Sequence, residues 1–599
     1  MKKRLAAILM LLSFVILMCP ALASNAAEGT SGDGLSWSLD EDGTLTISGS
    51  GDMDDYVYIN RFDSVPWSSC RDNIKEVKIL PGVTSVGEYA FRGCESLERV
   101  SLPEGLETIG ECAFSDCLCL EAADIPGSVS EIREYAFSNC PSLIKVSLPD
   151  TLECLPDGVF SGCGALLSAP LPRGLITIGE GAFSQCAALT EIAIPESVSE
   201  IQAGAFTDCT SLRSVYIPDG VSFIGEGAFA RCTALSDLRL PARIDRVSDS
   251  LFEGCVSLQS VELPSGITLI ESEAFYGCTS LDYVNLPDGV KKIGDRAFDG
   301  CTSLQMIRLP AALEKICVLA FENCTALKSI ELPETLSDMD AGAFQGCVSL
   351  AGASVPGGVV TIKNSVFNGC TALYAVCIPK SVTQVEPYAF YGCTALKDIY
   401  YAGSRDAWQS VYIGEETGAL SSAAVHFEND GSVCGFSDVH VFDYFSDGVK
   451  WAYENDITNG TSETTFSPWA ALTRAQAVTF IWRAYGRPAP DAAECPFYDV
   501  DTSSWYGEAV MWAVETGITN GTSETTFSPD ATLTRGQLIT LLWRAAGEPG
   551  KSGSTIWYAD AERWADGAAI TQGTAAKYET NGACPRADTA VYIYRAFSK

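Results

Sequence analysis

Histidine and basic residues are scarce in this chain of 599 residues. It has two histidines, His426 and His440, and 39 basic against 76 acidic residues, a formal net charge of −37. Both histidines lie beyond the long repeat region described below, so that region cannot form a His-based triad or a multi-histidine zinc site. Nucleic acid is a poor partner, because phosphate backbones need clustered Lys and Arg. We therefore expect no enzyme, metal or cofactor site and no nucleic-acid partner.

Long apolar runs are absent except near the start. Residues 1–26 join a basic MKKR to an apolar run and offer Ala-x-Ala at Ala21 to Ala23, which is typical of a secretory signal peptide. An uncleaved membrane anchor is the alternative, although the run is short and Pro20 interrupts it. No other segment is apolar enough to cross a bilayer. We expect an extracellular protein without a transmembrane segment after signal removal.

The chain is rich in one repeat. Fourteen cysteines recur every 23 residues, each with a phenylalanine three residues before it and a leucine three residues after it. The three columns run from Cys94 to Cys393, from Phe91 to Phe390 and from Leu97 to Leu396. A fixed period of this length predicts a solenoid, in which each unit buries its apolar face against its neighbours.

One unit shows how a coil is built. Leu97, Val100 and Leu102 match an LxxLxL strand whose apolar residues point inward. Pro103 and Gly105 then end the strand and permit a turn. The rest of the inward layer is expected to be Leu106, Ile109, Ala113, Phe114 and Cys117.

The cysteine column has three interpretations: a disulfide framework, a metal array or buried thiols. We favour buried thiols, because one cysteine recurs at the same inward position and free cysteine is among the most buried residue types. The phenylalanine column is interpreted as core. Bridges among the off-column cysteines cannot be assigned from the sequence; these include Cys112, Cys119, Cys154, Cys317 and Cys377.

The period reads IGxxAFxGCxxLxxIxLPxxV from Val83 to about Ile399 and resembles the BspA-like leucine-rich repeats of bacterial surface proteins. The segment LSWSLDEDGTLTISGSG reads as a hairpin and resembles the N-terminal cap of that family, and IYYAGSRDAWQSVYIG resembles its C-terminal cap. The expected boundaries are 27–80 for the first cap, 81–398 for the repeats and 399–430 for the second cap and linker. The resemblance implies adhesion or binding of host proteins.

Side chains between the strand leucines should face outward, and tyrosine and arginine among them are favoured interface residues. The alternative is an ordinary solvated surface, because no charge stripe or aromatic ladder runs along the array. The candidates are Arg213, Tyr216, Arg239, Tyr283, Arg308 and Tyr374.

The end of the chain is a second repeat. ITNGTSETTFSP occurs at Ile457 and again at Ile518, 61 residues later, and a weaker third copy follows. We name the copies module 1 (431–490), module 2 (491–550) and module 3 (551–599, degenerate). Each reads as helix, loop, helix, with Thr473 and Thr534 placed as N-caps. In module 2, one apolar helix face is predicted from Leu538, Leu541, Leu542 and Ala545.

These copies resemble S-layer homology modules. The resemblance implies a pseudo-threefold bundle that holds a pyruvylated secondary cell wall polysaccharide in grooves between modules. The family arginine falls on Arg474, Arg535 and Arg586, the loop glycine on Gly460, Gly521 and Gly573, and the FxDV aspartate on Asp438 and Asp499.

A planar guanidinium suits the carboxylate of a pyruvate ketal, and a ring such as Trp451 or Trp512 suits a sugar face. The alternative is that the tryptophans belong to the core and the arginines only cap the bundle. Module 3 departs from the pattern, since it lacks FxDV and has Pro585 in place of the threonine. The family glutamate after the arginine is replaced in all three modules, by Gln476, Gln537 and Asp588.

The sequence thus predicts a multidomain protein: a right-handed leucine-rich repeat solenoid of 14 coils, each a strand with a turn or short helical segment, then an α-helical pseudo-threefold bundle. We expect non-covalent anchoring to the wall polysaccharide and display of the solenoid to an unknown extracellular or host macromolecule. The rival roles are a structural S-layer or spacer protein without a specific ligand and, less favoured, a wall- or glycan-acting enzyme.

Overall fold

The computed structural model describes residues 27–59, 62–491, 494–552, 556–572, 574 and 581–598. The predicted signal peptide lies outside the described residues. The chain divides into two compact units. Unit 1 holds the described residues up to Ser303 together with 316–322, and unit 2 holds 304–315 and the described residues from 323 onward.

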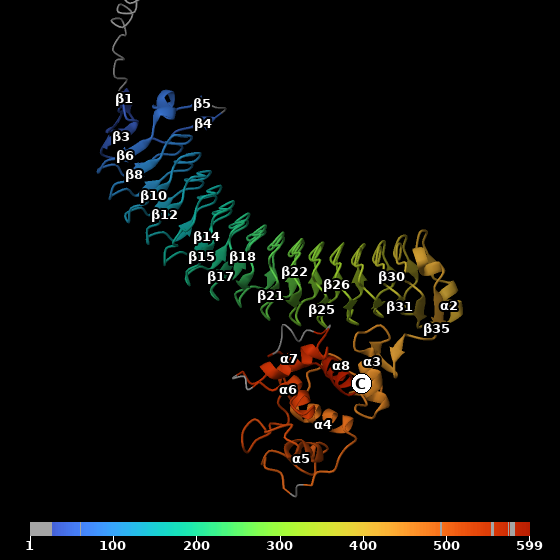
Figure 1. The fold of residues 1–599 in the computed structure, drawn as a ribbon. Helices are drawn as coiled ribbons and strands as arrows, with labels where there is room; N and C mark the ends of the chain where they lie inside the picture. Colours follow the sequence, from blue (N-terminus) through green and yellow to red (C-terminus); the bar gives the residue numbers. More distant parts are fainter. Residues whose placement is uncertain are drawn as a thin grey trace, which may run out of the picture. The chain divides into compact units, whose positions relative to one another are not determined.

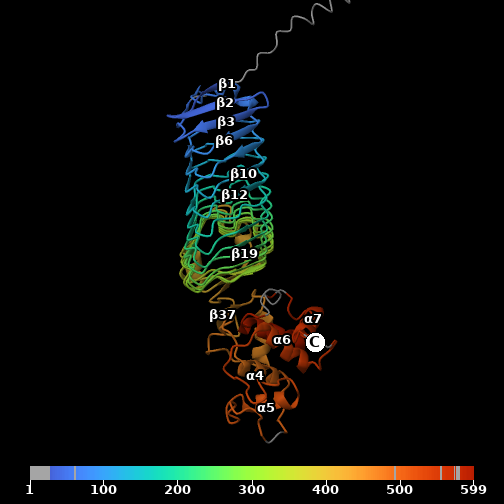
Figure 2. The same cartoon turned by 90° about the vertical axis from the view of Figure 1, so that its left-hand side faces the viewer.

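Unit 1 begins with the predicted hairpin. Strand β2 (Leu35–Leu39) pairs antiparallel with β3 (Thr44–Gly49), with Trp37 opposite Ile47 and Leu39 opposite Leu45. β1 (Ala27–Thr30) adds to the outer edge of β2, and β3 pairs in parallel with β6 (Glu76–Ile79), the first solenoid strand. Figure 2 shows these strands in succession at one end of the unit. The hairpin therefore covers the open edge that the first coil would otherwise expose.

The coils of unit 1 carry two rows of short parallel strands (Figure 1). Partners in both rows are 23 residues apart, as Ala122 and Lys145 are in the first row. The first row is β6, β8 (Arg99–Ser101), β10 (Ala122–Asp124), β12 (Lys145–Ser147), β15 (Glu191–Ala193), β17 (Ser214–Tyr216), β19 (Asp237–Arg239), β21 (Ser260–Glu262) and β23 (Tyr283–Asn285). The second row is β7 (Ser85–Val86), β9 (Thr108–Ile109), β11 (Glu131–Ile132), β13 (Cys154–Leu155), β14 (Thr177–Ile178), β16 (Glu200–Ile201), β18 (Phe223–Ile224), β20 (Arg246–Val247), β22 (Leu269–Ile270) and β24 (Lys292–Ile293).

The second row was not expected from the sequence. A two-residue strand gives no alternating pattern, so only the parallel pairing between coils reveals it. Turns, rather than short helices, join the strands between β7 and β24. Of the inward residues predicted for the first unit, Leu97, Phe114 and Cys117 are fully buried, whereas Val100 and Leu102 are half-buried.

The phenylalanine and cysteine columns are buried in the core, as predicted. From Phe91 to Phe298 successive rings stack with centroids 5.1 to 6.2 Å apart, and Trp67 of the cap extends the stack by lying 5.2 Å from Phe91. The described cysteines form no disulfide. Most thiols of the column donate to the carbonyl oxygen of the phenylalanine one coil earlier, as Cys209 does to Phe183 at 3.1 Å. The off-column Cys119 and Cys154 are exposed, whereas Cys317 and Cys377 are buried.

Unit 2 continues the same pattern and closes it with a longer coil. Its first-row strands are β25 (Met306–Ile307), β27 (Ser329–Ile330), β29 (Gly352–Ser354), β31 (Ala375–Ile378), β33 (Asp398–Tyr401) and β35 (Ala424–Phe427). Its second-row strands include β28 (Asp338–Met339), β30 (Thr361–Ile362), β32 (Gln384–Val385) and β34 (Tyr412–Ile413).

The solenoid has about 15 turns in residues 76–427, one more than the period predicted. Asp398 pairs with Ala424, a longer step than 23 residues, because the closing coil contains helix α2 (Arg405–Gln409) and a 3₁₀ turn at Gly418–Ser421. Its cysteine and phenylalanine are missing, so the period cannot detect it. The predicted C-terminal cap is this coil, so His426, expected beyond the repeats, lies within the solenoid, where it pairs with Tyr400.

A short hairpin, β36 (Ser432–Val433) and β37 (Phe436–His440), leads from the solenoid to the helices. Within unit 2, Phe442 forms a small buried cluster with Ala375 and Cys377, and Tyr400 packs against it. His440 Nε2 lies 3.1 Å from Ser354 Oγ. The hairpin and Phe442 are thus packed on the last coils of their own unit.

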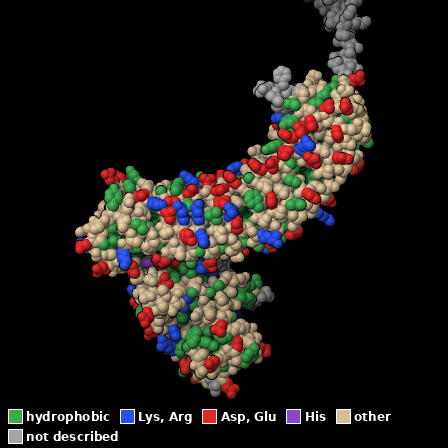
Figure 3. Space-filling view, turned by 180° about the vertical axis from the view of Figure 1, so that it is seen from behind, with side chains coloured by type: hydrophobic (Ala, Val, Ile, Leu, Met, Phe, Trp, Pro, Cys, Tyr) green, Lys and Arg blue, Asp and Glu red, His purple; other side chains and the backbone are tan. Residues whose placement is uncertain are grey.

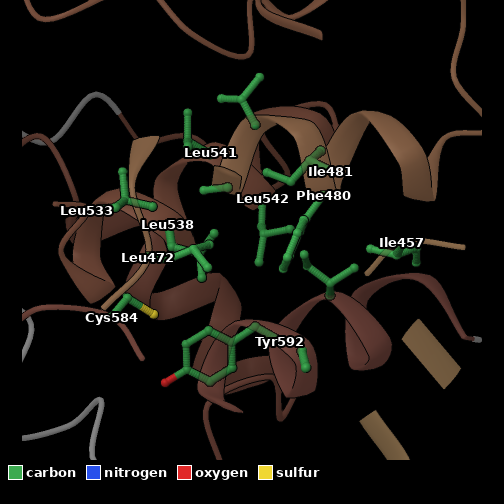
Figure 4. Packing of buried hydrophobic residues seen from close by; sticks show 14 of the residues in the cluster. Ile457, Leu472, Phe480, Ile481, Leu533, Leu538, Leu541, Leu542, Cys584 and Tyr592 are labelled. Atoms are coloured by element: carbon green, nitrogen blue, oxygen red, sulfur yellow. The ribbon is translucent and has the colours of Figure 1, made fainter. Parts of the chain in front are cut away.

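The helical region consists of three helix pairs. These are α3 (Ser446–Glu454) with α4 (Arg474–Ala484), α5 (Gly507–Glu515) with α6 (Arg535–Ala545), and α7 (Ala559–Gly567) with α8 (Arg586–Phe597). The second helix of each module packs on the first helix of the next: α4 on α5, α6 on α7, and α8 back on α3. One core joins all three modules, and Figure 4 shows Leu472, Leu533 and Cys584 directed into it. No helix among the described residues has the length and apolarity needed to cross a membrane.

Candidate functional site

The three modules meet at a closed ring of backbone hydrogen bonds. The amide of Leu472 donates to the carbonyl of Cys584 at 3.0 Å, Cys584 donates to Leu533 at 2.8 Å, and Leu533 donates to Leu472 at 2.9 Å. Each residue lies two positions before the second helix of its module. The ring gives the bundle a pseudo-threefold relationship and fixes where each second helix begins.

The helix starts continue this cyclic pattern. The amide of Arg474 donates to Ala531, that of Arg535 to Gly582 and that of Arg586 to Ala470, each at 3.0 Å. Free amides at a helix start need acceptors, and here the loop of the next module supplies them. Each predicted arginine therefore stands at a junction between two modules.

Arg474 is buried at the junction of modules 1 and 2. Arg474 is 7% exposed, and its Nε donates to the carbonyl oxygen of Phe527 at 2.9 Å. The guanidinium carbon lies 5.0 Å from the centre of the Phe527 ring, within cation–π range. Burial lowers the pKa of Arg474. Its partner in the described part of the chain is a carbonyl, so the positive charge is not neutralised by an ion pair there.

Arg586 occupies the equivalent position between modules 3 and 1. Its Nε donates to the carbonyl oxygen of Phe466 at 2.8 Å, and Nη2 donates to Thr458 Oγ1 at 3.1 Å. The guanidinium carbon lies 4.8 Å from the Phe466 ring centre and 5.6 Å from that of Phe480. Burial lowers the pKa of Arg586 to about 10, which leaves the group charged at neutral pH. This site repeats the chemistry of the Arg474 site.

Arg535 differs from the other two arginines. Its Nε lies 2.8 Å from Asp588 Oδ2, and the two side chains are 6% and 1% exposed. The second carboxylate oxygen of Asp588 accepts a hydrogen bond of 2.6 Å from Tyr444 Oη. Although burial alone would lower it, the pKa of Arg535 is raised by the charge of Asp588 and its hydrogen bond. The junction of modules 2 and 3 therefore contains a buried ion pair.

The FxDV aspartates hold the repeated loops in place. Asp438 accepts hydrogen bonds from the amides of Phe466 at 2.8 Å and Ser467 at 2.7 Å. Asp499 does the same for Phe527 and Ser528, both at 2.8 Å. These bonds orient the loop whose phenylalanine carbonyl receives the neighbouring arginine. The aspartates thus position the site through the backbone.

The loop glycines are required by backbone geometry. Gly460 and Gly521 have φ of +82° and +76°, and a Cβ on either would lie 2.5 or 2.3 Å from the carbonyl oxygen of Thr465 or Thr526. Only glycine fits both constraints. Gly573, the third predicted glycine, lies outside the described residues.

The tryptophans fall into two groups. Trp512 is 7% exposed and lies 5.3 Å from the Tyr485 ring, while the half-buried Trp451 lies 5.8 Å from Tyr594. Sequence analysis did not single out Trp505 and Trp557, which are 58% and 56% exposed. They precede α5 and α7 at equivalent positions, directly before Tyr506 and Tyr558. Their shared place before the first helix is the signal that could have identified them.

The solenoid candidates are distributed over both units. In unit 1, Arg213 is exposed, Tyr216 is 48% exposed, and the Arg239 guanidinium lies 5.9 Å from the Tyr216 ring centre and 3.2 Å from Asp219. Tyr283 is half-buried. In unit 2, Arg308 is exposed and Tyr374 donates to the carbonyl of Val441 at 3.5 Å. Figure 3 shows acidic and basic side chains interspersed over the visible face. Of these candidates, Tyr216 and Arg239 lie within cation–π range of each other.

The bundle offers buried guanidinium groups beside aromatic rings at the junctions between modules, and exposed tryptophans before α5 and α7. This chemistry suits an anionic carbohydrate, because cations hold the acid groups and rings pack on sugar faces. Among the described residues there is no group of three or more His, Cys, Asp or Glu side chains able to hold a metal ion.

A repeat solenoid followed by such a bundle defines a class of wall-attached surface protein, and the comparisons agree. Residues 66–189, 176–305 and 291–410, more than half of the chain, match the BspA type leucine rich repeat region, so the chain belongs to that family. Residues 435–478 and 496–539 match the S-layer homology domain, within modules 1 and 2.

Curated relatives resemble part of the chain. An endoglucanase of Bacillus sp. (strain KSM-635) is 33% identical over 118 residues, 20% of this chain and 12% of that protein. The surface-layer 125 kDa protein of Lysinibacillus sphaericus is 30% identical over 145 residues, 23% of this chain and 12% of that protein. A cell surface protein of Thermoanaerobacter kivui is 29% identical over 134 residues, 21% and 17% respectively. The chain therefore spans less than a fifth of the length of these relatives.

Solved structures resemble the chain as well. A leucine-rich repeat protein from Bacteroides ovatus has 28% identity and a TM-score of 0.45, covering 66% of this chain and 98% of its own. A leucine rich cell surface protein from Faecalibacterium prausnitzii has 27% identity and a TM-score of 0.33, covering 64% and 97%.

Proposed function

We propose that this protein is held at a bacterial cell wall by its helical bundle and displays its solenoid outside the cell to bind proteins or glycans. The proposal is non-enzymatic. The observation that carries it is the burial of Arg474 and Arg586 against carbonyls and phenylalanine rings. In the described part of the bundle neither guanidinium has a carboxylate partner, and a buried unpaired cation favours the binding of an anionic ligand.

The anchoring ligand is proposed to be a secondary cell wall polysaccharide with pyruvate ketals. A ketal carboxylate fits a planar guanidinium through paired hydrogen bonds, and the Phe466 and Phe527 rings stabilise the cation from the other side. The overall negative charge of the protein repels an acidic polymer, so local arginines are needed to bind it. Trp505, exposed beside α5, is proposed as a platform for a sugar ring.

Co-sedimentation with wall sacculi tests the anchor. We expect the full-length protein to pellet with polymer-bearing sacculi and to stay in solution with sacculi stripped of the polymer. Arg474→Ala and Arg586→Ala should each weaken pelleting at least tenfold, because a charge-assisted hydrogen bond is lost. Arg487→Ala is the matched control, since Arg487 is an exposed arginine of module 1. Equal pelleting with stripped sacculi would contradict the proposal.

For the solenoid, the paired Tyr216 and Arg239 favour a recognition role for unit 1, because exposed tyrosine and arginine are enriched in interfaces. We expect the full-length protein to bind immobilised extracellular matrix or bacterial surface extract saturably. The double variant Tyr216→Ser/Arg239→Ser should bind less, and Tyr135→Ser, which removes a tyrosine of 46% exposure, should not. An ordered lattice of purified protein without any saturable partner would instead favour a structural S-layer role.

A further inference from the structure

The three equivalent arginines of the bundle do not have equivalent partners. Arg474 and Arg586 direct Nε to the carbonyl oxygens of Phe527 and Phe466, whereas Arg535 directs Nε to the carboxylate of Asp588. In the first two sites the carboxylates that contribute favourable charge, Asp499 and Asp438, each accept hydrogen bonds from two backbone amides. Among the described residues, Arg535 is the one of these three arginines whose charge is paired with a carboxylate.

The sequence of module 3 explains why the Asp588 side chain is available to pair with Arg535. In modules 1 and 2 the third helical residue is Gln476 or Gln537, and its side-chain oxygen accepts from the N-cap amide of Thr473 or Thr534 at 3.1 Å. In module 3 the N-cap is Pro585, which has no amide proton. The capping box cannot form, so the Asp588 side chain turns away from the N-cap.

The absence of the FxDV motif from module 3 also favours the pairing of Asp588 with Arg535. Asp499 lies near enough to Arg474, and Asp438 near enough to Arg586, to contribute favourable charge. Module 3 has no FxDV aspartate for Arg535. Asp588 supplies a carboxylate instead, and its second oxygen is held by Tyr444 of module 1. Module 3 has thus exchanged a loop aspartate for one that contacts the guanidinium directly.

We propose that Asp588 is a built-in ligand mimic: its carboxylate takes, on Arg535, the place that an acid group of the wall polymer takes on Arg474 and Arg586. The bundle then has two polymer sites instead of three. This rests on the proposed anchoring function. An incoming carboxylate would have to displace a buried, doubly hydrogen-bonded aspartate and leave it beside a second negative charge, which is strongly unfavourable.

Binding stoichiometry tests the proposal directly. The probe is a methyl hexopyranoside carrying a 4,6-pyruvate ketal, titrated into the full-length protein by calorimetry, with the ketal methyl ester as the uncharged control. We expect two probe molecules per wild-type chain, and one in Arg474→Ala or Arg586→Ala. Asp588→Asn, which keeps the shape and removes the charge, should raise the number to three.

A second variant covers the case in which Asp588→Asn does not fold. Arg535→Met/Asp588→Leu replaces the buried pair with apolar side chains, a change that folded proteins tolerate. Two probe molecules should still bind, because Arg535 holds none in the wild type. Three sites in the wild type, or loss of one site in this double variant, would overturn the proposal. A wild type that binds neither probe nor sacculi would instead disprove the anchoring function itself, and with it the inference.

Discussion

The thiol of Cys278 donates a hydrogen bond to the carbonyl oxygen of Phe252, one coil earlier, across 3.1 Å. The same bond recurs along both units, for example from Cys117 to Phe91 and from Cys393 to Phe367. Adjacent coils are thus joined by two contacts: stacked phenylalanine rings and a hydrogen bond from a thiol to a phenylalanine carbonyl. This explains why cysteine recurs at a position that any small apolar residue could fill.

Thiol reactivity should distinguish column cysteines from the others. Burial raises the pKa of Cys278 to about 12, so almost no thiolate forms at neutral pH. We expect iodoacetamide to modify the exposed Cys119 and Cys154 in the native protein, and column cysteines only after unfolding. Peptide mass spectrometry checks this, with protein in guanidinium chloride as the control. Rapid native modification of Cys278 would contradict a closed core.

Removing one ring from the stack should weaken the solenoid. Phe206 is fully buried, with neighbouring ring centroids 5.5 and 5.3 Å away. Phe206→Ala should cost about 3–5 kcal/mol of local stability, through lost burial and a cavity. Phe223→Ala is the control, because Phe223 is 46% exposed, and should change stability by about 0.5 kcal/mol or less. Urea unfolding followed by circular dichroism measures both; equal midpoints would exclude the ring stack as core.

Two glycines of module 2 separate backbone strain from steric conflict. Gly517 and Gly521 have φ of +74° and +76°, but a Cβ on Gly517 would meet no atom within 4 Å, whereas one on Gly521 would lie 2.3 Å from Thr526 O. Gly517→Ala should cost about 1–2 kcal/mol, the left-handed penalty alone. Gly521→Ala should cost more and also weaken sacculus binding, because the loop of Phe527 shifts. Thermal unfolding and co-sedimentation of both variants check this. Equal melting temperatures for the two variants would show that the loop accommodates the added Cβ without loss of stability.

A charge cluster in unit 2 should make stability depend on acid. Lys315 and Lys363 each contact both Asp338 and Asp340, at 2.5 to 3.0 Å. Burial alone would raise the pKa of Asp338, but the hydrogen bonds and charges of the two lysines outweigh it, and the pKa lies below the ordinary 3.8.

Because the folded pKa of Asp338 is below the unfolded one, its stabilising contribution is complete above about pH 5 and is lost as the pH falls below about 4. The wild type should therefore lose more melting temperature between about pH 5 and pH 2.5 than Asp338→Asn does. Glu104→Gln, which changes an exposed carboxyl group, should keep the wild-type slope. Parallel slopes for wild type and Asp338→Asn would mean that the lysines are screened by solvent.

Periodic features could be predicted from the sequence because each depends on neighbours at a fixed spacing. The 23-residue period predicts the buried columns, the alternating apolar pattern predicts the hairpin, and the threonines before Arg474 and Arg535 predict the two N-caps. The closing segment is predicted as a cap but not as a further coil, because it breaks the period. The second row of strands is not predicted, because two-residue strands are too short to show a pattern.

The sequence by itself determined that this is a repeat solenoid followed by three related helical modules, because period and capping act locally. Only the tertiary structure decided the state of each arginine. Arg535 and Asp588 lie 53 residues apart and meet solely because the bundle closes module 3 on its neighbours. The tertiary structure also decided that Trp512 is buried and Trp505 exposed, because the packing of one module on the next, and no local pattern, sets which ring faces solvent.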